Sequence, residues 1–512
     1  MPGRVTNQFE QNCFIFSNKL CTKQRDCNNK KGNEQMLFNS IDFAIFFPVV
    51  FLLYWFVIKE LKFQNMLLLI SSYFFYACWD YRFLFLLVFS TFLSYFTVIK
   101  MCETKNSSVK KFWFWFNISA NLGFLGFFKY YNFFAISFSE SLSHLGIQTN
   151  PWTLKVILPI GISFYTFHGL SYVIDVYKNK IPPCKNVVEY SVFVCFFPLL
   201  VAGPIERATH LLPQIQKSRK FDYFKASDGL KQVLWGLFKK IVIADNCAEY
   251  ANLIFDNPSI YSGSTHVIGA IFFTIQIYCD FSAYSDIALG TARLLGIELL
   301  RNFAFPYFSR DIAEFWRRWH ISLTTWFRDY LYIPLGGSKG GIWIKIRNTF
   351  IIFIVSGFWH GANWTFIAWG VLNAIYFLPL LLLNKNRDNI EIVAKGKYLP
   401  SVKDLINIGT TFGLTVFAWI FFRSQSISYA LMYVSEIFSK SLFTKPEILP
   451  KKLLLLITIF FIIEWIGRES QFAIQSFFIK RNYLFRWSFY YVIIFIILIF
   501  AGANQQFIYF QF

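Results

Sequence analysis

The chain alternates between long apolar runs and short polar segments, most of which are basic. A helix that crosses the hydrocarbon core of a membrane needs about 20 predominantly apolar residues. Several runs approach this length, and some are short or interrupted by polar residues. The pattern predicts an all-α integral membrane protein with about 10–12 spanning helices, together with re-entrant or short helices. The candidate spans are 41–58, 63–79, 82–101, 112–138, 154–177, 187–205, 266–279, 344–360, 363–383, 406–422, 453–467 and 486–501.

Basic residues between the runs indicate how the spans are oriented. Excess Lys and Arg mark cytoplasmic loops, and the segment 100–111 carries four lysines. Strict alternation from that loop would place the basic segment 206–240 outside. A re-entrant segment in "FFPLLVAGPIER", which enters and leaves the membrane on the same side, would return the basic segment 206–240 to the cytoplasmic side. Because broken backbone is tolerated in a membrane only where protein or water satisfies it, we expect a cavity in the middle of the protein.

Residues 1–35 differ from the rest of the chain because they are polar, mixed in charge and without a continuous apolar stretch. They do not form a signal peptide, which needs an uninterrupted apolar core. Met36 begins a segment that runs directly into the first candidate span. We expect residues 1–35 to be a disordered extension or a non-native start, followed by one transmembrane domain at 36–512.

Composition supports a membrane protein and excludes other classes. Mean hydropathy is +0.44. Charged residues make up 15% of the chain, well below the roughly 25% of an average soluble protein. The net charge of +20 would suggest nucleic acid in a soluble protein. No folded basic domain lies outside the apolar segments, so we predict lipid contact and no nucleic-acid partner. The nine cysteines show no CxxC or metal-ligand spacing, and no metal site is predicted.

His360 is the leading candidate for chemistry among the six histidines. It lies in "SGFWHGANW", between strongly apolar stretches. An ionisable group at such depth is costly and indicates function, and a neutral imidazole is a suitable general base. If the segment is helical, Ser356 or Asn363 could orient the ring. The structural alternative is a buried histidine satisfied by a backbone carbonyl.

His320 lies 40 residues earlier, in "DIAEFWRRWHISLTTWF". We expect Trp316, Trp319 and His320 to share one flank of a helix. His168 lies within a candidate span, where a packed structural role is favoured over a functional one. Three further histidines lie in loops or at span edges and are interpreted as incidental: His144, His210 and His266.

Charged residues near these histidines leave alternatives open. Glu314 and Arg318 are spaced as an i,i+4 pair that would stabilise a helix. Arg317 and Arg318 fit membrane anchoring at least as well as ligand binding. Asp280 and Asp286 end an apolar run and need partners. We favour structural salt bridges to nearby arginines for both acids. Local hydroxyl groups come from Tyr278, Ser282, Tyr284 and Ser285.

The sequence motifs argue against several classes of enzyme. No P-loop, GxGxxG or GxSxG motif occurs in a suitable context. Acyl transfer fits the two intramembrane histidines, because a base activates a hydroxyl and the acyl donor brings its own leaving group. Transport of a charged solute is the competing hypothesis from another class.

Six stretches, taken in order, resemble the membrane-bound O-acyltransferase (MBOAT) family across nearly all of 36–512. The most similar branch is the bacterial alginate O-acetyltransferase-like one, which includes peptidoglycan O-acetyltransferases. Teichoic-acid D-alanyl transfer is a more distant branch and an alternative function. The stretches are "LPIGISFYTFHGLSYVIDVY", "FFPLLVAGPIER", "IYCDFSAYSDIALGTARLLGI", "NFAFPYFSRDIAEFWRRWHISLTTWFRDYLYIPLGG", "SGFWHGANWTFIAWG" and "FIYFQF".

The resemblance implies a ring of helices around a thinned centre with a narrow tunnel. It implies that His360, in the WHG motif, is catalytic and that His320, in the RRWH motif, is the second active-site histidine. It also implies a multi-pass protein of the bacterial cytoplasmic membrane, with acetyl-CoA as cytosolic donor and a polysaccharide as acceptor. A periplasmic partner of the SGNH-hydrolase-like type is expected to complete the transfer.

Acyl transfer from acetyl-CoA at these two histidines suggests further candidate residues. The indoles of Trp316, Trp319 and Trp359 are expected to exclude water. The guanidinium groups of the nearby arginines are candidates for binding the phosphates of the donor. The secondary candidates for substrate binding are Arg317, Arg318, Arg328, Asn363, Asp280 and Tyr284.

Overall fold

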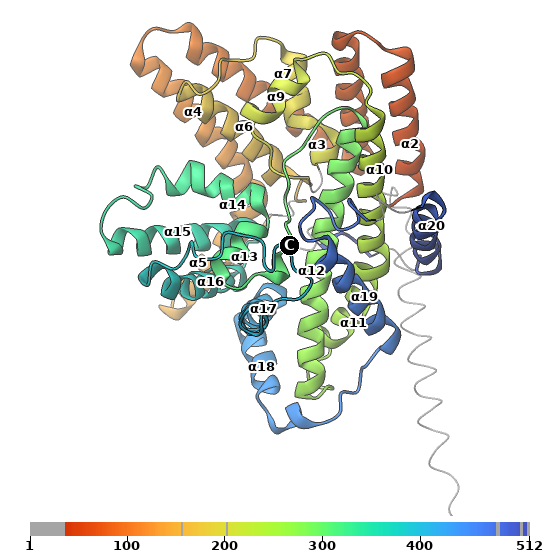
Figure 1. Cartoon of the computed structure of the whole chain (residues 1–512). Helices are drawn as coiled ribbons and strands as arrows, with labels where there is room; N and C mark the ends of the chain where they lie inside the picture. Colours follow the sequence, from red (N-terminus) through yellow and green to blue (C-terminus); the bar gives the residue numbers. More distant parts are fainter. Residues whose placement is uncertain (1–35, 155–156, 201–202, 478–481, 502–504, 509–512) are drawn as a thin grey trace, which may run out of the picture.

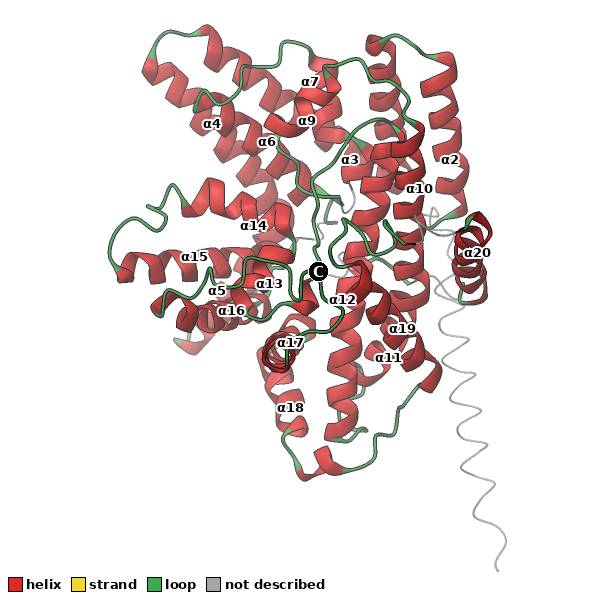
Figure 2. Cartoon of the chain, in the orientation of Figure 1, coloured by secondary structure: helices red, strands yellow, loops and turns green. Residues whose placement is uncertain are grey.

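The protein is helical throughout the part of the chain that its computed structural model describes, which is residues 36–154, 157–200, 203–477, 482–501 and 505–508. No strand occurs within those ranges (Figure 2). The prediction for residues 1–35 falls outside the described residues.

The first half contains α2 (Ile41–Leu52), η1 (Leu53–Val57), α3 (Leu61–Glu103), α4 (Ser107–Leu125), η2 (Gly126–Tyr130), α5 (Tyr131–His144), α6 (Ile162–Tyr177), α7 (Val187–Cys195), α8 (Phe197–Leu200), α9 (Ala208–Ile215), α10 (Tyr223–Phe238), η3 (Lys239–Ala244) and α11 (Asp245–Phe255). The second half contains α12 (Gly263–Leu294), η4 (Pro306–Phe308), α13 (Ile312–Arg318), α14 (Ile321–Phe327), η5 (Arg328–Tyr332), α15 (Ile342–His360), α16 (Trp364–Leu382), α17 (Val402–Arg423), α18 (Ile427–Ile437), η6 (Lys440–Phe443), α19 (Lys451–Gly467) and α20 (Tyr483–Ile499).

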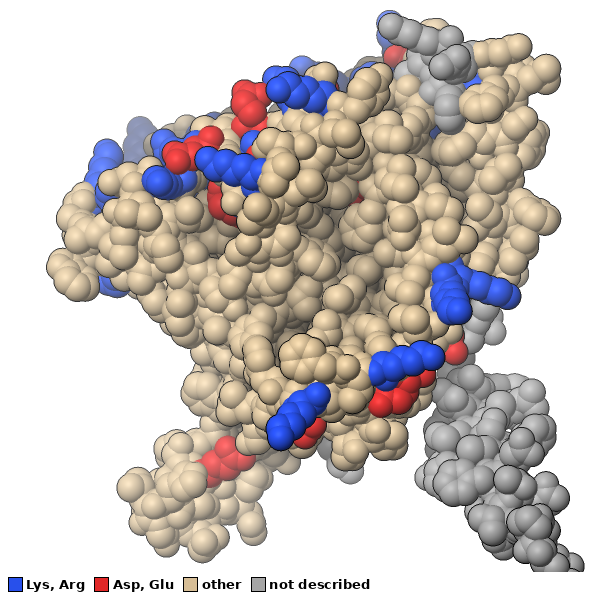
Figure 3. All heavy atoms as spheres, turned by 60° about the horizontal axis from the view of Figure 1, so that its bottom comes forward, with Lys and Arg blue, Asp and Glu red and all other residues tan. Residues whose placement is uncertain are grey.

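The outer surface is that of an integral membrane protein. Large apolar side chains face outward on many helices, such as Phe85 at 76% exposure and Leu498 at 68%. An apolar surface of this extent needs a lipid or protein partner. Figure 3 shows charged side chains along two edges of one face, with a wide uncharged surface between them. Five of the described helices are long and apolar enough to cross a membrane.

The five candidate spans are α3, α12, α15, α16 and α17, and α2–η1 and α20 are shorter apolar helices. α3 is bent at Asp80, whose φ of −160° and ψ of 109° are not helical. The bend divides α3 into two arms that correspond to the predicted spans 63–79 and 82–101. The all-helical membrane class is therefore confirmed, while the count of 10–12 crossings and the central tunnel stay predictions.

α12 is the central helix and packs directly on α10 (Figure 1). A Cβ built on Gly229 of α10 would lie 2.8 Å from the carbonyl oxygen of Gly290 on α12. A Cβ on Gly290 would lie 2.5 Å from the carbonyl oxygen of Gly229. Small residues let helix backbones approach closely in membranes, where lipid removes the usual hydrophobic driving force. The predicted span 266–279 covers less than half of α12, because polar residues in its second half are buried inside the protein.

The segment predicted as a span at 187–205 is broken into short helices. α7 has nine residues, about 13 Å of helix at 1.5 Å per residue, and so it cannot cross a core about 30 Å thick. Polar side chains from other helices satisfy the interrupted backbone. The N–H of Phe197 donates to Ser72 Oγ at 3.0 Å, and the N–H of Glu206 donates to His168 Nε2 at 3.1 Å. The break at this segment and a packed role for His168 are both confirmed.

We predict that Gly290→Ala lowers the midpoint of thermal unfolding in detergent, because the new methyl group would overlap the backbone of α10. Overpacking of this kind costs about 1–3 kcal/mol. The matched control is Gly413→Ala in α17, where a Cβ would have no atom within 4 Å. An equal midpoint for Gly290→Ala and Gly413→Ala would contradict the close packing of α10 on α12.

Candidate active site

His320 lies at a break between two short helices. α13 ends at Arg318, α14 begins at Ile321, and His320 has a left-handed backbone with φ 43° and ψ 53°. This conformation is strained for a residue with a side chain and persists only where neighbours hold it. The expected placement of Trp316, Trp319 and His320 on one flank of a single helix is wrong, because the helix stops before Trp319.

Asn302 holds this break through both its backbone and its side chain. Its carbonyl accepts from the N–H of Ile321 at 2.9 Å, and its Oδ1 accepts from Ser322 Oγ at 2.9 Å. Oδ1 also lies 3.2 Å from His320 Nδ1. Because an amide oxygen can only accept, Nδ1 is assigned as the protonated nitrogen. Nε2 of His320 is then a hydrogen-bond acceptor, and it has no hydrogen-bond partner in the described ranges.

His360 is the last residue of α15, and side chains from η2 hold the end of that helix. The ammonium of Lys129 donates to the carbonyls of Trp359 at 2.7 Å and His360 at 2.9 Å. The hydroxyl of Tyr130 donates to the carbonyl of Phe358 at 3.1 Å. The last carbonyls of a helix have no partner inside the helix. Lys129 and Tyr130 therefore satisfy them and fix the backbone of His360.

The two histidines face each other inside the protein. Their ring centroids are 6.3 Å apart, although 40 residues separate them in the chain. His320 is 1% exposed and His360 is 6% exposed. This arrangement places two buried imidazoles next to each other, and the catalytic roles of the residues stay predictions.

Tryptophan rings surround the two histidines. We call this group the aromatic wall, and its members are Trp316, Trp319, Trp359, Trp369 and Trp419. Trp359 lies 6.1 Å from the ring of His320, and Trp369 lies 5.4 Å from the ring of His360. Trp316 packs on Trp369 at 5.6 Å and donates its indole N–H to the Asn373 side chain at 3.2 Å. Trp319 packs on Trp419 at 5.2 Å. The three predicted tryptophans line or support this apolar surrounding, and the sequence pattern gave no signal for Trp369 or Trp419.

Of the two predicted orienting partners of the His360 ring, Ser356 lies one helical turn before His360 in α15, as expected, whereas Asn363 lies outside that helix. α15 ends at His360, so Asn363 does not follow it by one helical turn, and that expectation is wrong. Asn363 instead caps α16, accepting from the N–H of Thr365 at 3.0 Å. Its amide nitrogen donates to the carbonyl of Gln425 at 2.9 Å. The close approach of α16 to α15 occurs at Gly357, where a Cβ would overlap the backbone of Phe366.

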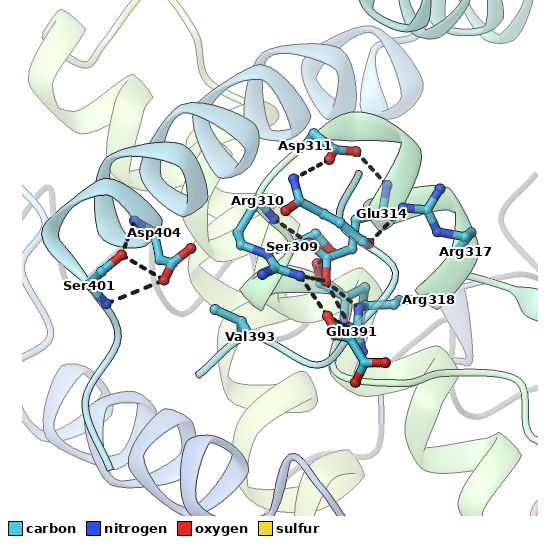
Figure 4. A network of polar contacts seen from close by, with 12 residues as sticks. Ser309, Arg310, Asp311, Glu314, Arg317, Arg318, Glu391, Val393, Ser401 and Asp404 are labelled. Carbon is cyan, nitrogen blue, oxygen red and sulfur yellow. Dashed lines mark hydrogen bonds and ion pairs between the residues drawn. The ribbon is translucent and has the colours of Figure 1, made fainter. Parts of the chain in front are cut away.

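Glu314 is a buried acid held between two arginines (Figure 4). It pairs with Arg318 at 2.8 Å, which confirms the predicted i,i+4 pair, and with Arg310 at 3.0 Å. Arg310 also donates to the backbone carbonyl of Glu391 at 2.6 Å, in the loop between α16 and α17. This network fastens the loop to α13.

The other predicted arginines have protein partners as well. Arg317 donates to the carbonyls of Asn386 and Asn389, both at 2.8 Å. Arg328 is exposed and pairs with Asp329 at 2.8 Å. Arg317 and Arg318 thus donate hydrogen bonds to backbone carbonyls of the 386–391 loop. Neither of the two predicted roles, membrane anchoring and donor binding, included these contacts. Binding of donor phosphates by these arginines stays a prediction.

The two acids of α12 form buried ion pairs, as predicted, but their partners are lysines of η3. Asp280 pairs with Lys240 at 2.8 Å, and Asp286 pairs with Lys239 at 2.6 Å. The expectation of arginine partners is wrong, because the adjacent η3 carries both lysines to the face of α12. Asp280 also accepts from the N–H of Ile508 at 2.7 Å, so it holds residues near the end of the chain.

Tyr284 takes part in the same attachment. Its ring packs on Phe507 at 4.2 Å, and Phe507 packs on Phe281 at 6.0 Å. Phe281 in turn packs on the ring of His320 at 4.7 Å. Asp280 and Tyr284 therefore connect the residues around Phe507 to the wall behind His320. Direct binding of substrate by either residue stays a prediction.

Comparison with known proteins identifies the family to which this chain belongs. A model of the membrane-bound O-acyltransferase family matches residues 176–423, which include both histidines. The probable alginate O-acetylase AlgI of Pseudomonas aeruginosa is 38% identical over 79% of this chain and 75% of its own length. The peptidoglycan O-acetyltransferase of Helicobacter pylori is 36% identical over 77% of this chain and 78% of its own length. The teichoic acid D-alanyltransferase of Bacillus subtilis is 28% identical over 52% of this chain and 69% of its own length, in keeping with the more distant relation expected.

We predict that Lys240→Met destabilises the protein strongly, because it leaves the buried carboxylate of Asp280 without its cation. Removing one partner of a buried ion pair costs about 3–5 kcal/mol. The control is Lys395→Met, which breaks an exposed pair with Glu391. Thermal unfolding in detergent should separate the two variants. Equal unfolding midpoints would show that the Lys240–Asp280 pair does not support the fold.

Proposed function

This chain belongs to the membrane-bound O-acyltransferase family, and from that premise we propose that it O-acetylates a cell-surface or periplasmic polysaccharide. The acetyl donor in this proposal is acetyl-CoA, a cytosolic thioester. The observation that carries the proposal is the pair of buried imidazoles, His320 and His360, 6.3 Å apart within an aromatic wall.

In the proposed reaction His360 is the general base. It takes the proton of an acceptor hydroxyl, and the oxygen forms a bond to the acyl carbon of the thioester. The carbon–sulfur bond breaks, and the thiolate of coenzyme A leaves with the proton from His360. General-base help is worth roughly 10²–10⁴ in rate. Holding both reactants in line contributes further by removing the entropy cost of their encounter.

The hydrogen bonds of His320 narrow its proposed role. Its Nδ1–H is directed to Asn302, so Nε2 is the nitrogen that can meet a substrate, and it accepts hydrogen bonds. An accepting nitrogen cannot donate to the acyl carbonyl. It can accept from a hydroxyl of the acceptor and so align the acceptor. Asn302 is then a positioning residue for His320.

The surrounding tryptophans support acyl transfer over hydrolysis. The indoles of Trp316, Trp319 and Trp359 contribute to a packed apolar wall, and all three are less than 10% exposed. Exclusion of water protects a thioester from hydrolysis before the acceptor attacks it. The same wall strengthens electrostatic interactions at the reacting atoms.

The proposed setting is the cytoplasmic membrane of a bacterium, with transfer toward the outer side. A periplasmic partner of the SGNH-hydrolase-like type would take the acetyl group to the final polysaccharide. The relatives named as O-acetylating enzymes match more of this chain than the D-alanyltransferase does. That difference favours acetyl over D-alanyl transfer from a carrier protein. Solute transport is the competing class that the experiments below separate.

We predict that His360→Ala lowers acetylation of surface glycans at least about 100-fold, because the general base is lost. Membrane insertion of the variant should be normal. The control is His144→Ala, which alters an exposed histidine at the end of α5. Wild-type acetylation by His360→Ala, measured as ester acetate released from purified glycan, would refute the proposed base.

We predict that His320→Ala causes a severe loss of activity, smaller than that of His360→Ala if its role is to align the acceptor. Asn302→Leu should lower kcat in the same direction, since it removes the acceptor that fixes the His320 tautomer. Asn302→Asp keeps an accepting oxygen and should retain more activity than Asn302→Leu. Steady-state kinetics of acetyl-CoA turnover tests the order. Equal kcat for Asn302→Leu and wild type would contradict the positioning role.

A further inference from the structure

A cavity of about 450 Å³ opens where the start of α10 meets η1 and the end of α12. Its volume is in the usual range of small-molecule sites, which is roughly 300–1,000 Å³. The segment 220–225 supplies three aromatic rings and two lysines to the lining, namely Phe221, Tyr223, Phe224, Lys220 and Lys225. The two histidines of the candidate active site do not line this cavity, so it is a separate site.

The cavity lies at the edge of the lipid-facing surface. Trp55 lines it, and the next two side chains, Phe56 and Val57, are mostly exposed. Exposed lysines follow at Lys59 and Lys62. An apolar surface that gives way to lysines, with aromatic residues at the boundary, is typical of the level of the lipid headgroups. The cavity therefore lies at the height of the headgroup layer.

The aromatic side chains of the segment 220–225 are unusually exposed for their size. Tyr223 is 71% exposed and Phe224 is 83% exposed. The ring of Phe221 packs edge-on against Trp55 at 5.5 Å, and about half of its surface stays exposed. An exposed group of large rings needs a partner. At the headgroup level that partner is lipid, where aromatic rings are enriched.

Arg293 forms the inner wall of the cavity and is already paired. Its guanidinium pairs with Asp228 at 2.8 Å and with Glu298 at 3.1 Å. Its third nitrogen donates to the side chain of Gln471 at 2.8 Å. Arg293 therefore closes the inner end of the cavity, and the two acids beside it are engaged.

The two lysines at the mouth of the cavity remain for a ligand. Lys220 is exposed and forms no ion pair within the described ranges. Lys225 lies 3.5 Å from Glu298 in an exposed pair that solvent weakens. Asp222 is the one acid in the described lining, and it caps α10 by accepting from the N–H groups of Phe224 and Lys225. The mouth of the cavity is therefore positive.

Arg219 places a further positive charge behind the same wall. It is 9% exposed, and its Nε and Nη1 have no hydrogen-bond partner within the described ranges. Its Nη2 donates to Asn65 Oδ1 at 2.5 Å, which is a neutral partner. A Cβ built on Gly296, which lines the cavity, would lie 3.5 Å from Arg219 Cβ. A charge buried without a counter-ion is costly, so an anion in the cavity would stabilise Arg219 through the intervening wall.

We propose that this cavity binds the phosphate headgroup of an anionic phospholipid. The ammonium groups of Lys220 and Lys225 donate charge-assisted hydrogen bonds to the phosphate oxygens, and the negative charge compensates Arg219. The three aromatic rings of the segment 220–225 lie beside the glycerol and the first part of the acyl chains. A soluble phosphate would leave these rings in contact with water, whereas a lipid covers them. The bound lipid fastens the start of α10 to η1 and the end of α12.

Native mass spectrometry of the purified full-length protein tests the proposal. The protein is released from mixed micelles that contain phosphatidylglycerol and phosphatidylcholine in equal amounts and with identical acyl chains, and the retained lipids are counted. Each cation near the headgroup strengthens the binding of an anionic lipid several-fold. We therefore expect wild type to retain phosphatidylglycerol with a preference of at least about tenfold. Equal retention of the two lipids would overturn the proposal.

Variants assign the preference to the cavity. Lys220→Gln combined with Lys225→Gln should lower the preference for phosphatidylglycerol about tenfold or more, because it removes both donors. The matched control combines Lys105→Gln with Lys178→Gln, which removes two exposed lysines outside the cavity and changes the net charge equally. The control should keep the preference of wild type. An equal preference in the two double variants would assign it to the net charge of the protein and contradict the proposal.

Two soluble competitors separate the lipid from other phosphates. Glycerol 3-phosphate carries the phosphate without acyl chains, and in excess it should leave the retained phosphatidylglycerol unchanged. Coenzyme A carries the phosphates of the proposed donor, and it should leave the retained lipid unchanged as well. Displacement by glycerol 3-phosphate would assign the cavity to a free phosphate, and displacement by coenzyme A would assign it to the donor. Either displacement would overturn the lipid assignment.

Discussion

The structure depends on one constraint, which is that polar groups inside a membrane must be satisfied by the protein itself. Water is not available there to bond a free carbonyl, amide or charge. The described residues meet this requirement at three helix ends or breaks. Lys129 closes the carbonyl end of α15, Asn302 holds the break at His320, and Ser72 and His168 satisfy the backbone around α8.

These solutions also explain why the histidines meet. A helix end inside the protein leaves backbone polar groups that need partners, and those partners fix the backbone there. His320 lies at the start of α14 and His360 at the end of α15. Asn302 also contacts the ring of His320, and Lys129 fixes the backbone of His360. In the proposed mechanism, structural and catalytic requirements therefore fall on the same few residues, and the aromatic wall makes their surroundings apolar.

Much of the architecture follows from local sequence patterns, whereas the detailed geometry of the site does not. Apolar runs predicted most helices, and i,i+4 spacing predicted the Glu314–Arg318 pair, because both signals lie within one element. The partners of Asp280 and of the His360 carbonyl come from elements far away in the chain, at Lys240 and Lys129. Local spacing carries no signal for such pairs. The left-handed backbone of His320 was also missed, because a helix-like pattern continues through it and no glycine marks the break.

The most direct test of acyl transfer across the membrane uses sealed proteoliposomes with acetyl-CoA on one side and a hydroxyl acceptor on the other. The acetyl group and coenzyme A carry different isotopic labels. The two-histidine site predicts acetyl ester in the acceptor compartment, with all of the coenzyme A retained on the donor side. Appearance of intact acetyl-CoA or labelled coenzyme A in the acceptor compartment, without ester formation, would show transport and contradict the account.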